Sequence, residues 1–295
     1  MTPLPAVRSL AFLTGALIVA CTAETGAAKS ARVVSVSKQI NEFIYAIGAQ
    51  DVLIGRDLTS VFPPEIKKIP SVGYHRGLSA EGIVSLKPRL FLTDGNVGPE
   101  SVLDQLRKVG IPIVVLDPGS TEDSAQQLLM ELGRRFHREH TADSVVKEWQ
   151  RETASISADS ARWNPASRPR VLLMHFGQVI NNYLAVNRGS AADVMIRRAG
   201  GINAIDSIGG MTRLSPELIA RAQPDVIIAT DVGFDRLGAA KFAQLPGVSL
   251  TPAAKNARIF RIDESDIMYF GPRTPKTVAR LGEMIHPEIA HISGR

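Results

Sequence analysis

The order of apolar and polar residues between positions 78 and 92 recurs between positions 214 and 228. Each copy begins with leucine and serine, has a glutamate two residues after the serine, and continues to a proline and an apolar run. Ser79 and Ser215 are placed to accept a hydrogen bond from a free backbone amide at the start of a helix. Each copy therefore predicts a capped helix that ends before the proline, followed by a buried strand. The pair of copies predicts two related lobes, and two facing lobes form a cleft.

Short apolar runs alternate with helix-like segments along the rest of the chain. The predicted helices include Lys38–Ile47, residues 99–109 and the segment after Thr274–Pro275. The runs that read as strands are residues 32–36, 52–55, 111–116, 170–174 and 257–262. Strands this apolar, alternating with helices, are typical of a parallel sheet buried on both faces. We therefore expect an α/β fold of two Rossmann-like lobes with parallel central sheets.

A long segment between the two lobes has the composition of a helix. Between Ser120 and Trp163 there is no proline, and Gly133 is the only glycine. The segment predicts one long backbone helix, or two helices joined near His140–Thr141. We divide the chain into an N-terminal lobe, a linking helix and a C-terminal lobe, covering residues 32–117, 118–165 and 168–295. A rigid connection of this kind predicts only a small opening and closing of the cleft.

Residues 1–28 have the pattern of a secretory signal peptide. Arg8 is the only charge before a short apolar run, Leu10–Ala20, and small residues follow to Ala28. That run is too short for a permanent membrane span, and no other stretch is apolar for long enough. Cys21 follows the run directly and leaves two interpretations open. It is either an acylated cysteine that anchors a lipoprotein, or a residue discarded with the leader.

Charge and cysteine content exclude several functions. The formal net charge of +5 is spread along the chain and lacks the clustered basic and aromatic residues of a nucleic-acid groove. The chain beyond Cys21 has no cysteine for a disulfide, a metal site or a nucleophile. The nucleophile elbow and the phosphate loop typical of common enzyme families are also missing. We therefore expect no nucleic-acid partner and no enzymatic activity.

These features together resemble the helical-backbone class of periplasmic binding proteins, which carry cobalamin, ferric siderophores or haem to ABC importers. Within that class, three segments are similar to the haem-binding branch. They are Val72–Arg76 with the adjoining Leu78–Glu81, then Arg188–Asp193, and finally Phe270–Pro275. The resemblance covers essentially the whole mature chain. It implies a monomer in the periplasm that captures ferric haem b between its lobes and delivers it to an inner-membrane ABC permease with its ATPase subunit.

The resemblance makes Tyr74 the haem iron ligand, because it matches the tyrosine of the family's Gly-Tyr-x-Arg segment. A phenolate is a hard anionic donor that suits ferric iron, and a nearby cation lowers the cost of ionising the phenol. If this segment is extended, Arg76 lies on the same face as Tyr74 and His75 points away. Arg76 could then donate to the phenolate or to a haem propionate. Without the resemblance, a tyrosine packed on a lobe edge explains the same residue.

His175 is a candidate second iron ligand, because it comes just after an apolar strand whose carboxyl end faces a ligand crevice. Some members of the haem branch place an axial histidine near this point. A loop histidine bonded to a backbone carbonyl is the alternative, and His75 is a weaker substitute as ligand. The remaining histidines are expected to be solvated: His137, His140, His286 and His291.

Two arginines and two glutamates complete the candidate site residues. Arg236 and Arg273 follow strands of the second lobe and suit haem propionates, although each could equally be a surface residue. In the family, one glutamate on each lobe pairs with arginines of the permease, and Glu81 and Glu217 occupy equivalent places in the repeat. A first-turn glutamate that offsets the helix dipole is a compatible alternative.

Other ligands remain open at this point. A ferric siderophore or cobalamin on the same fold is the first alternative, and an exported haem-processing enzyme is the second. A zinc or manganese carrier would need three or four convergent histidines and carboxylates, and the histidines here are too scattered.

Overall fold

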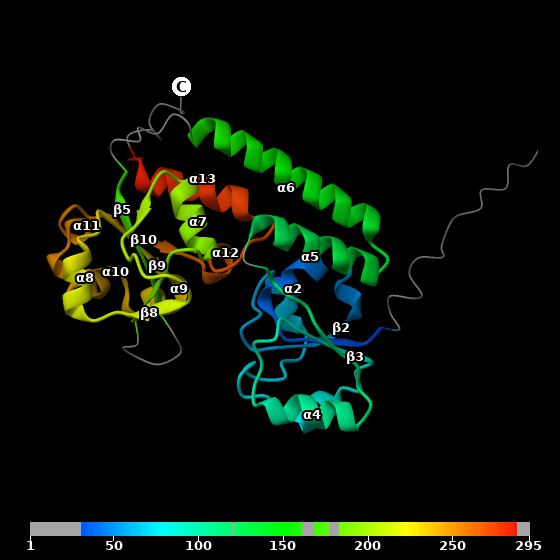
Figure 1. Ribbon diagram of the computed structural model, residues 1–295. Coiled ribbons are helices and arrows are strands. Elements are labelled where there is room, and N and C mark those ends of the chain that lie inside the picture. The colour runs from blue at the N-terminus through cyan, green and yellow to red at the C-terminus, as the bar shows by residue number, and fades with distance from the viewer. Residues whose placement is uncertain (1–30, 120, 161–167, 177–182, 288–295) are drawn as a thin grey trace, which may run out of the picture.

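The computed structural model describes residues 31–119, 121–160, 168–176 and 183–287. Two lobes are joined by a pair of helices, α5 (Glu122–Arg135) and α6 (Glu139–Ser160), as Figure 1 shows. The N-terminal lobe consists of β1 (Val33–Ser35), α2 (Lys38–Ala46), η1 (Gln50–Val52), β2 (Leu53–Arg56), η2 (Pro64–Lys68), α3 (Ala80–Ser85), β3 (Leu90–Thr93), α4 (Glu100–Lys108) and β4 (Ile113–Val115).

The C-terminal lobe is larger and carries more short helices. It consists of β5 (Arg170–Phe176), β6 (Tyr183–Val186), α7 (Ala191–Arg198), β7 (Ile202–Asn203), β8 (Met211–Arg213), α8 (Pro216–Ala222), β9 (Val226–Thr230), α9 (Asp231–Leu237), α10 (Ala239–Ala243), η3 (Val248–Leu250), α11 (Pro252–Lys255), β10 (Ile259–Ile262), α12 (Glu264–Ile267) and α13 (Thr274–Ile285). The α/β class and the two-lobe organisation are confirmed.

The sheet of the N-terminal lobe is parallel throughout, in the order β2-β1-β3-β4. Alternate residues of β1 point to opposite faces. Val33 belongs to a core that includes residues of α2 and α5, whereas Val34 packs in a second core with residues of α3 and α4. Both faces of the sheet are therefore buried, which explains why both valines of the strand are fully buried although they point to opposite faces.

The sheet of the C-terminal lobe is mixed, in the order β10-β9-β5-β6-β8, and β7 also pairs with β5. β10, β9 and β5 are parallel, but β6 and β8 are antiparallel to their neighbours. This antiparallel edge is a departure from the purely parallel sheet that the apolar pattern predicts. The central strand still alternates as expected, since Leu173 packs with α7 and α13 while Leu172 packs with α8 and α10.

The sequence repeat corresponds to equivalent elements of the two lobes. The Ser79 hydroxyl caps α3 by accepting from Gly82 N at 3.4 Å, and the Ser215 hydroxyl caps α8 by accepting from Leu218 N at 3.2 Å. Each helix leads into a strand, β3 or β9, that lies parallel to the first long strand of its lobe, β1 or β5. The predicted sequence of cap, helix and buried strand is confirmed in both copies.

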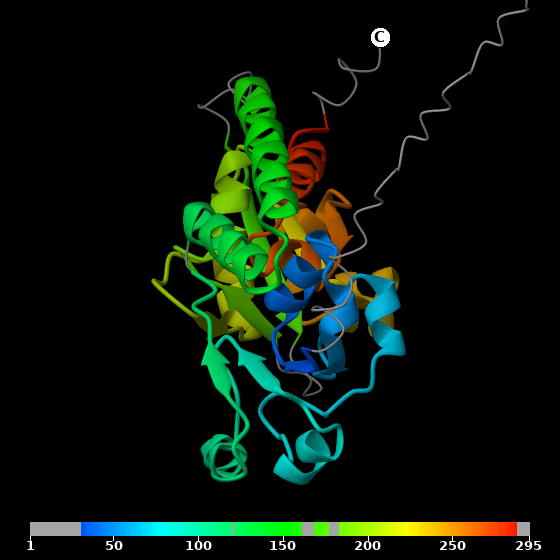
Figure 2. The same cartoon turned by 90° about the vertical axis from the view of Figure 1, so that its right-hand side faces the viewer.

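The connection between the lobes consists of two helices rather than one. α5 ends where His137 adopts a positive φ of 54°, so the chain turns at residues 136–138, just before the predicted joint. The two helices lie side by side in both views (Figures 1 and 2). Gly133 permits this close approach, because a Cβ built at that position would lie 2.6 Å from the Cβ of Ala142.

A single apolar core runs through both lobes and the connection. It includes Ile40 of α2, Trp149 of α6 and Leu281 of α13. The buried Glu122 of α5 accepts a hydrogen bond from Trp149 Nε1 at 2.5 Å and forms an ion pair with Arg198 of α7. Such continuity opposes large rotation of one lobe against the other, in keeping with the small cleft motion we predict.

The described part of the chain contains no helix with both the length and the hydropathy to cross a bilayer.

The crossing of α5 and α6 can be tested with two helical glycines. Gly133→Ala should lower the free energy of unfolding by about 1–3 kcal/mol, because the added methyl group forces the two helices apart. Gly82→Ala in α3 is the matched control, since nothing lies closer than 4.0 Å to its Cβ position. There the better helix propensity of alanine should raise stability by about 0.5–1 kcal/mol. Urea denaturation measures both, and equal effects would contradict the packing argument.

Candidate functional site

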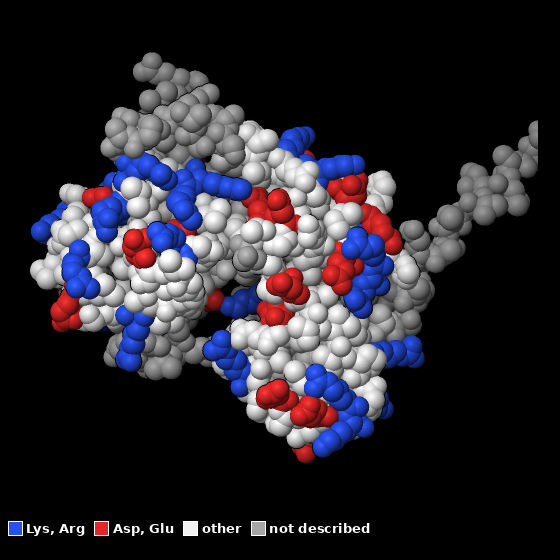
Figure 3. All heavy atoms as spheres, in the orientation of Figure 1, with Lys and Arg blue, Asp and Glu red and all other residues white. Residues whose placement is uncertain are grey.

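Residues at the ends of strands from both lobes meet at one opening. Lys38 follows β1 and Asp57 follows β2, while His175 lies at the end of β5 and Glu264 follows β10. Lys38 forms an ion pair with Glu264 across the lobe boundary. A notch between the two lobes is visible on the surface in Figure 3. The carboxyl ends of parallel strands commonly face a ligand crevice, so this notch is the candidate binding cleft.

The segment that carries Tyr74 is a turn rather than an extended strand. Gly77 N donates to the carbonyl oxygen of Tyr74 at 2.7 Å, and the ring of Tyr74 lies against that of His75, with centroids 4.4 Å apart. The expectation that His75 points away from Tyr74 is therefore wrong, because it assumed extended backbone. Tyr74 is 36% exposed, and its hydroxyl has no hydrogen-bond partner among the described residues.

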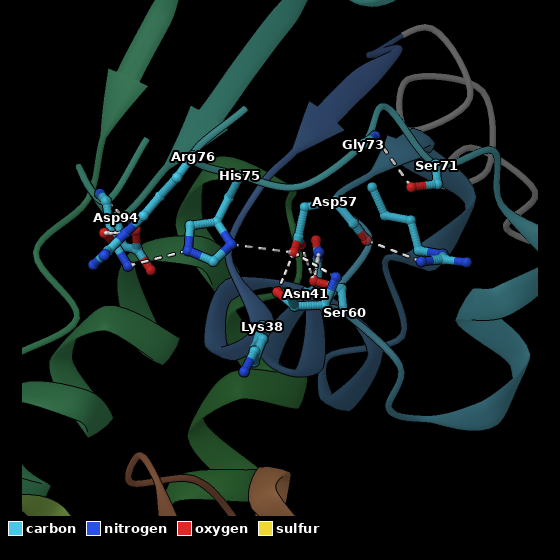
Figure 4. Close-up of polar contacts among 12 residues, drawn as sticks. Lys38, Asn41, Asp57, Ser60, Ser71, Gly73, His75, Arg76 and Asp94 are labelled. Carbon is cyan, nitrogen blue, oxygen red and sulfur yellow. Dashed lines mark hydrogen bonds and ion pairs between the residues drawn. The ribbon is translucent and has the colours of Figure 1, made fainter. Parts of the chain in front are cut away.

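His75 lies near a buried carboxylate, that of Asp57. Asp57 is fully buried and accepts from Thr59 N at 2.8 Å and from the hydroxyls of Thr59 and Ser60. Its Oδ2 lies 3.9 Å from His75 Nδ1 (Figure 4). Burial lowers the pKa of His75 despite the opposing effect of Asp57, so the ring is neutral at neutral pH. The ring beside Tyr74 thus has a fully buried carboxylate on its inner side.

Arg76 lies on the exposed side of the same turn. Its Nε donates to Asn96 Oδ1 at 3.0 Å, and Asn96 Nδ2 is 3.5 Å from His75 Nε2 (Figure 4). These contacts connect the turn to the segment that follows β3. The role of Arg76 toward a haem propionate stays a prediction.

His175 lies within β5. The apolar pattern predicts it just after the strand, so that placement is wrong by a residue or two. It pairs with Leu184 of β6, and its Nδ1 is 3.4 Å from the Thr230 hydroxyl. Burial lowers its pKa, so the imidazole is neutral. A neutral imidazole whose Nδ1 is occupied can offer Nε2 to a metal. The position is compatible with the ligand role, which stays a prediction.

Arg273 connects the lobes through a nearly buried carboxylate. Its Nε and Nη2 donate to Oε1 and Oε2 of Glu42, each at 2.8 Å, and it also pairs with Asp266. Tyr269 donates to the same Glu42 at 2.8 Å, and burial raises the pKa of this phenol, which keeps it protonated. The guanidinium carbon lies 3.6 Å from the centre of the Phe62 ring. The structure thus gives Arg273 an interlobe role, and its predicted propionate contact is untested.

The other predicted residues lie away from this contact. Arg236 is exposed near the end of α9. Glu81 and Glu217 are exposed in the first turns of α3 and α8, and a hydrogen bond from Ser215 lowers the pKa of Glu217. Both are therefore available to a partner, although docking stays a prediction. Cys21 lies outside the described residues.

One histidine expectation is wrong. His286 is 3% exposed at the end of α13, because the apolar face of that helix continues through its last turn. His137 and His140 are exposed as expected, and His291 lies outside the described residues. No three histidine, cysteine or carboxylate side chains gather as a metal site in the part of the chain that the structure describes.

Four residues of the lobe boundary were not predicted from the sequence: Lys38, Glu42, Glu264 and Tyr269. The sequence around Lys38 did contain an indication of its role, because a basic residue at the first position of a helix opposes the helix dipole. The sequence around Glu42 contained no such indication, since a single glutamate in an amphipathic helix is expected to be solvated. Only the approach of α12 and α13 to α2 makes it a buried residue.

Residues 33–265 match the family model described as periplasmic binding protein, so the chain belongs to the periplasmic binding protein family. It is a binding protein of the ABC importer class, and its relatives are substrate-binding transport proteins rather than enzymes.

The individual relatives are named for two different ligands, heme and vitamin B12. The periplasmic heme-binding protein RhuT from Roseiflexus sp. RS-1 in apo form is 32% identical, with a TM-score of 0.79, covering 87% of this chain and 98% of that one. The periplasmic heme-binding protein BhuT in complex with two hemes is 28% identical, with a TM-score of 0.78 and the same coverage. The vitamin B12-binding protein of Pectobacterium carotovorum subsp. carotovorum (strain PC1) is 31% identical, over 75% of this chain and 78% of its own length.

The two arginines predicted to contact haem should differ sharply in their effect on stability. Arg273→Ala removes the cation beside a nearly buried carboxylate and should lower the free energy of unfolding by about 3 kcal/mol. Arg236→Ala removes an exposed side chain and should change it by less than about 0.5 kcal/mol. Thermal and urea unfolding measure both. An unchanged midpoint for Arg273→Ala would refute the interlobe role.

Proposed function

We propose that this protein captures ferric haem in the cleft between its lobes and delivers it to an ABC permease in the inner membrane. The observation that carries the proposal is Tyr74. Its side chain is exposed, its ring contacts that of His75, and its hydroxyl has no hydrogen-bond partner among the described residues. The relatives described as heme-binding, at 32% and 28% identity over nearly their whole length, support the same ligand.

A phenolate from Tyr74 supplies the first axial bond to the iron. Ferric iron is hard and favours an anionic oxygen donor, and iron binding itself displaces the phenolic proton. The adjacent His75 ring, tilted by 56° against that of Tyr74, restricts where the phenol can point, so little side-chain freedom is lost when the bond forms. Arg76, exposed two residues further on, supplies positive charge for the phenolate or for a propionate.

His175 is the candidate for the bond on the opposite face of the iron. It belongs to the other lobe, and its neutral ring is anchored at Nδ1 by Thr230. Arg236 could contact a propionate from the exposed end of α9, whereas Arg273 would first have to leave Glu42.

Cobalamin is the second candidate, because the B12-binding relative is 31% identical. Cobalamin brings its own axial ligand to the cobalt, so a free phenol at the cleft has no coordinating role toward it. The two candidates therefore differ in how strongly binding depends on the hydroxyl of Tyr74.

An absorption titration of the purified protein with hemin tests the proposal. The wild type should develop a Soret band that saturates, and Tyr74→Phe should weaken binding at least about tenfold by deleting the donor oxygen alone. Tyr45→Phe is the control, because it removes a hydroxyl from a tyrosine of α2 in the same lobe. Tyr45 packs against the apolar core. It should bind hemin like the wild type.

The same titration with cyanocobalamin separates the candidates. Saturable binding of cyanocobalamin, with no Soret change for hemin, would replace haem by cobalamin as the ligand. A Soret band that is the same in Tyr74→Phe and in the wild type would remove the phenol from the iron.

Delivery to the permease can be tested apart from binding. The double variant Glu81→Arg/Glu217→Arg should abolish haem-dependent growth of cells that rely on this importer, because both lobes then repel the arginines of the permease. Glu100→Arg, which reverses an exposed first-turn charge of α4 outside the repeat, is the control. Hemin titrations of all variants should match the wild type. Loss of hemin binding in the double variant would show that these glutamates serve the fold or the cleft instead.

A further inference from the structure

Lys38 occupies an electrostatically unfavourable position at the base of the cleft. It is the first residue of α2, where backbone amides concentrate partial positive charge, and the first turn of α2 contains no acidic residue. A cation at this end of a helix is destabilising unless an anion lies nearby. In the structure that anion is Glu264, from the first turn of α12 in the other lobe.

The ion pair of Lys38 and Glu264 is accessible to water. The two side chains are 26% and 22% exposed, and a pair of this kind is worth little net free energy. The second interlobe ion pair, between Arg273 and Glu42, is different, because Glu42 is 5% exposed, accepts two hydrogen bonds from Arg273 and accepts a third from Tyr269. One pair is thus a permanent connection, and the other can open at low cost.

Lys38 also lies between the two proposed iron-binding regions. Lys38 begins α2 in the lobe that carries Tyr74, lies near His75 in the close-up (Figure 4), and pairs with Glu264 of the lobe that carries His175. The ammonium of Lys38 therefore lies at the boundary between the lobe of Tyr74 and the lobe of His175. A ligand bound between the lobes would approach this cation.

The wall opposite Lys38 is acidic. The backbone N of Glu264 donates to Asp231 Oδ1 at 3.0 Å, so the start of α12 carries Glu264 itself and has the Asp231 carboxylate beside its backbone. A ligand that carries carboxylates would be repelled by this wall. Lys38 is the cation placed to offset that repulsion, since Arg273 is occupied by Glu42 and Asp266.

We propose that Lys38 binds a carboxylate of the ligand, and that its ion pair with Glu264 is exchanged for this contact when the cleft fills. The inference rests on the proposed function, because haem carries two propionates on one edge of the macrocycle. The ligand class that Lys38 selects is a flat macrocycle with free carboxylates.

Two charge-neutralising variants should change affinity in opposite directions. Lys38→Gln removes the carboxylate partner and should weaken hemin binding about tenfold. Glu264→Gln frees Lys38 and removes a competing anion, so it should strengthen hemin binding several-fold. If the pair only connects the lobes, both variants break it equally and shift affinity in the same direction or not at all, which would overturn the inference.

The esterified ligand supplies the chemical control. Hemin dimethyl ester lacks the free carboxylates, so Lys38→Gln and the wild type should bind it equally. A tenfold loss that persists with the ester would show that Lys38 acts on the fold and not on a carboxylate. Lys38→Arg, which keeps the charge, should retain most of the hemin affinity.

A matched lysine outside the cleft completes the design. Lys276→Gln removes an exposed lysine that pairs with Glu152 at 3.7 Å, and it should leave hemin affinity unchanged. A wild type that shows no Soret change would reject the proposed function and the inference together. A wild type that binds hemin through Tyr74, with an equal affinity in Lys38→Gln, would reject the inference alone.

Discussion

The arrangement of the two lobes depends on one nearly buried carboxylate. Glu42 of α2 receives hydrogen bonds from Arg273 and Tyr269, two residues more than two hundred positions away in the chain. A carboxylate removed from water is costly unless such donors surround it, so the C-terminal segment has to remain against α2. The continuous apolar core behind this contact acts in the same direction. Together they fix the width of the cleft and the positions of the groups that face it.

Much of the fold follows from local patterns in the sequence. The apolar runs, the capping serines and the repeated helix-strand unit are short-range features, and each corresponds to an element of the structure. The sequence left open whether one helix or two connect the lobes. Apolar spacing alone does not reveal a residue with a positive φ such as His137, where the chain turns after α5. The antiparallel strands β6 and β8 were likewise not predicted, since strand direction depends on pairing across the sheet.

The candidate site was predictable only in its chemistry. Tyr74 and Arg76 were recognised by residue type and motif, but the turn that brings the rings of Tyr74 and His75 together was not, because the residue pattern had suggested extended backbone. His175 was placed one element too late because strand ends are uncertain by a few residues. The partners of Arg273 lie on α2 in the other lobe, and no local pattern identifies contacts that exist only after the lobes assemble.

The two copies of the internal repeat share a helix and a strand, but the segments that precede them differ. Aligning the two copies places Gly73–Gly77 of the first opposite Gly209–Arg213 of the second. The first segment is a turn that carries the phenol, whereas the end of the second forms β8 at a sheet edge. The repeated unit therefore has the same helix and strand in both copies, whereas the phenol proposed to bind iron precedes only the first copy. The two lobes share this unit but differ around it, so a flat ligand of the proposed kind would meet a different surface on each of its two faces.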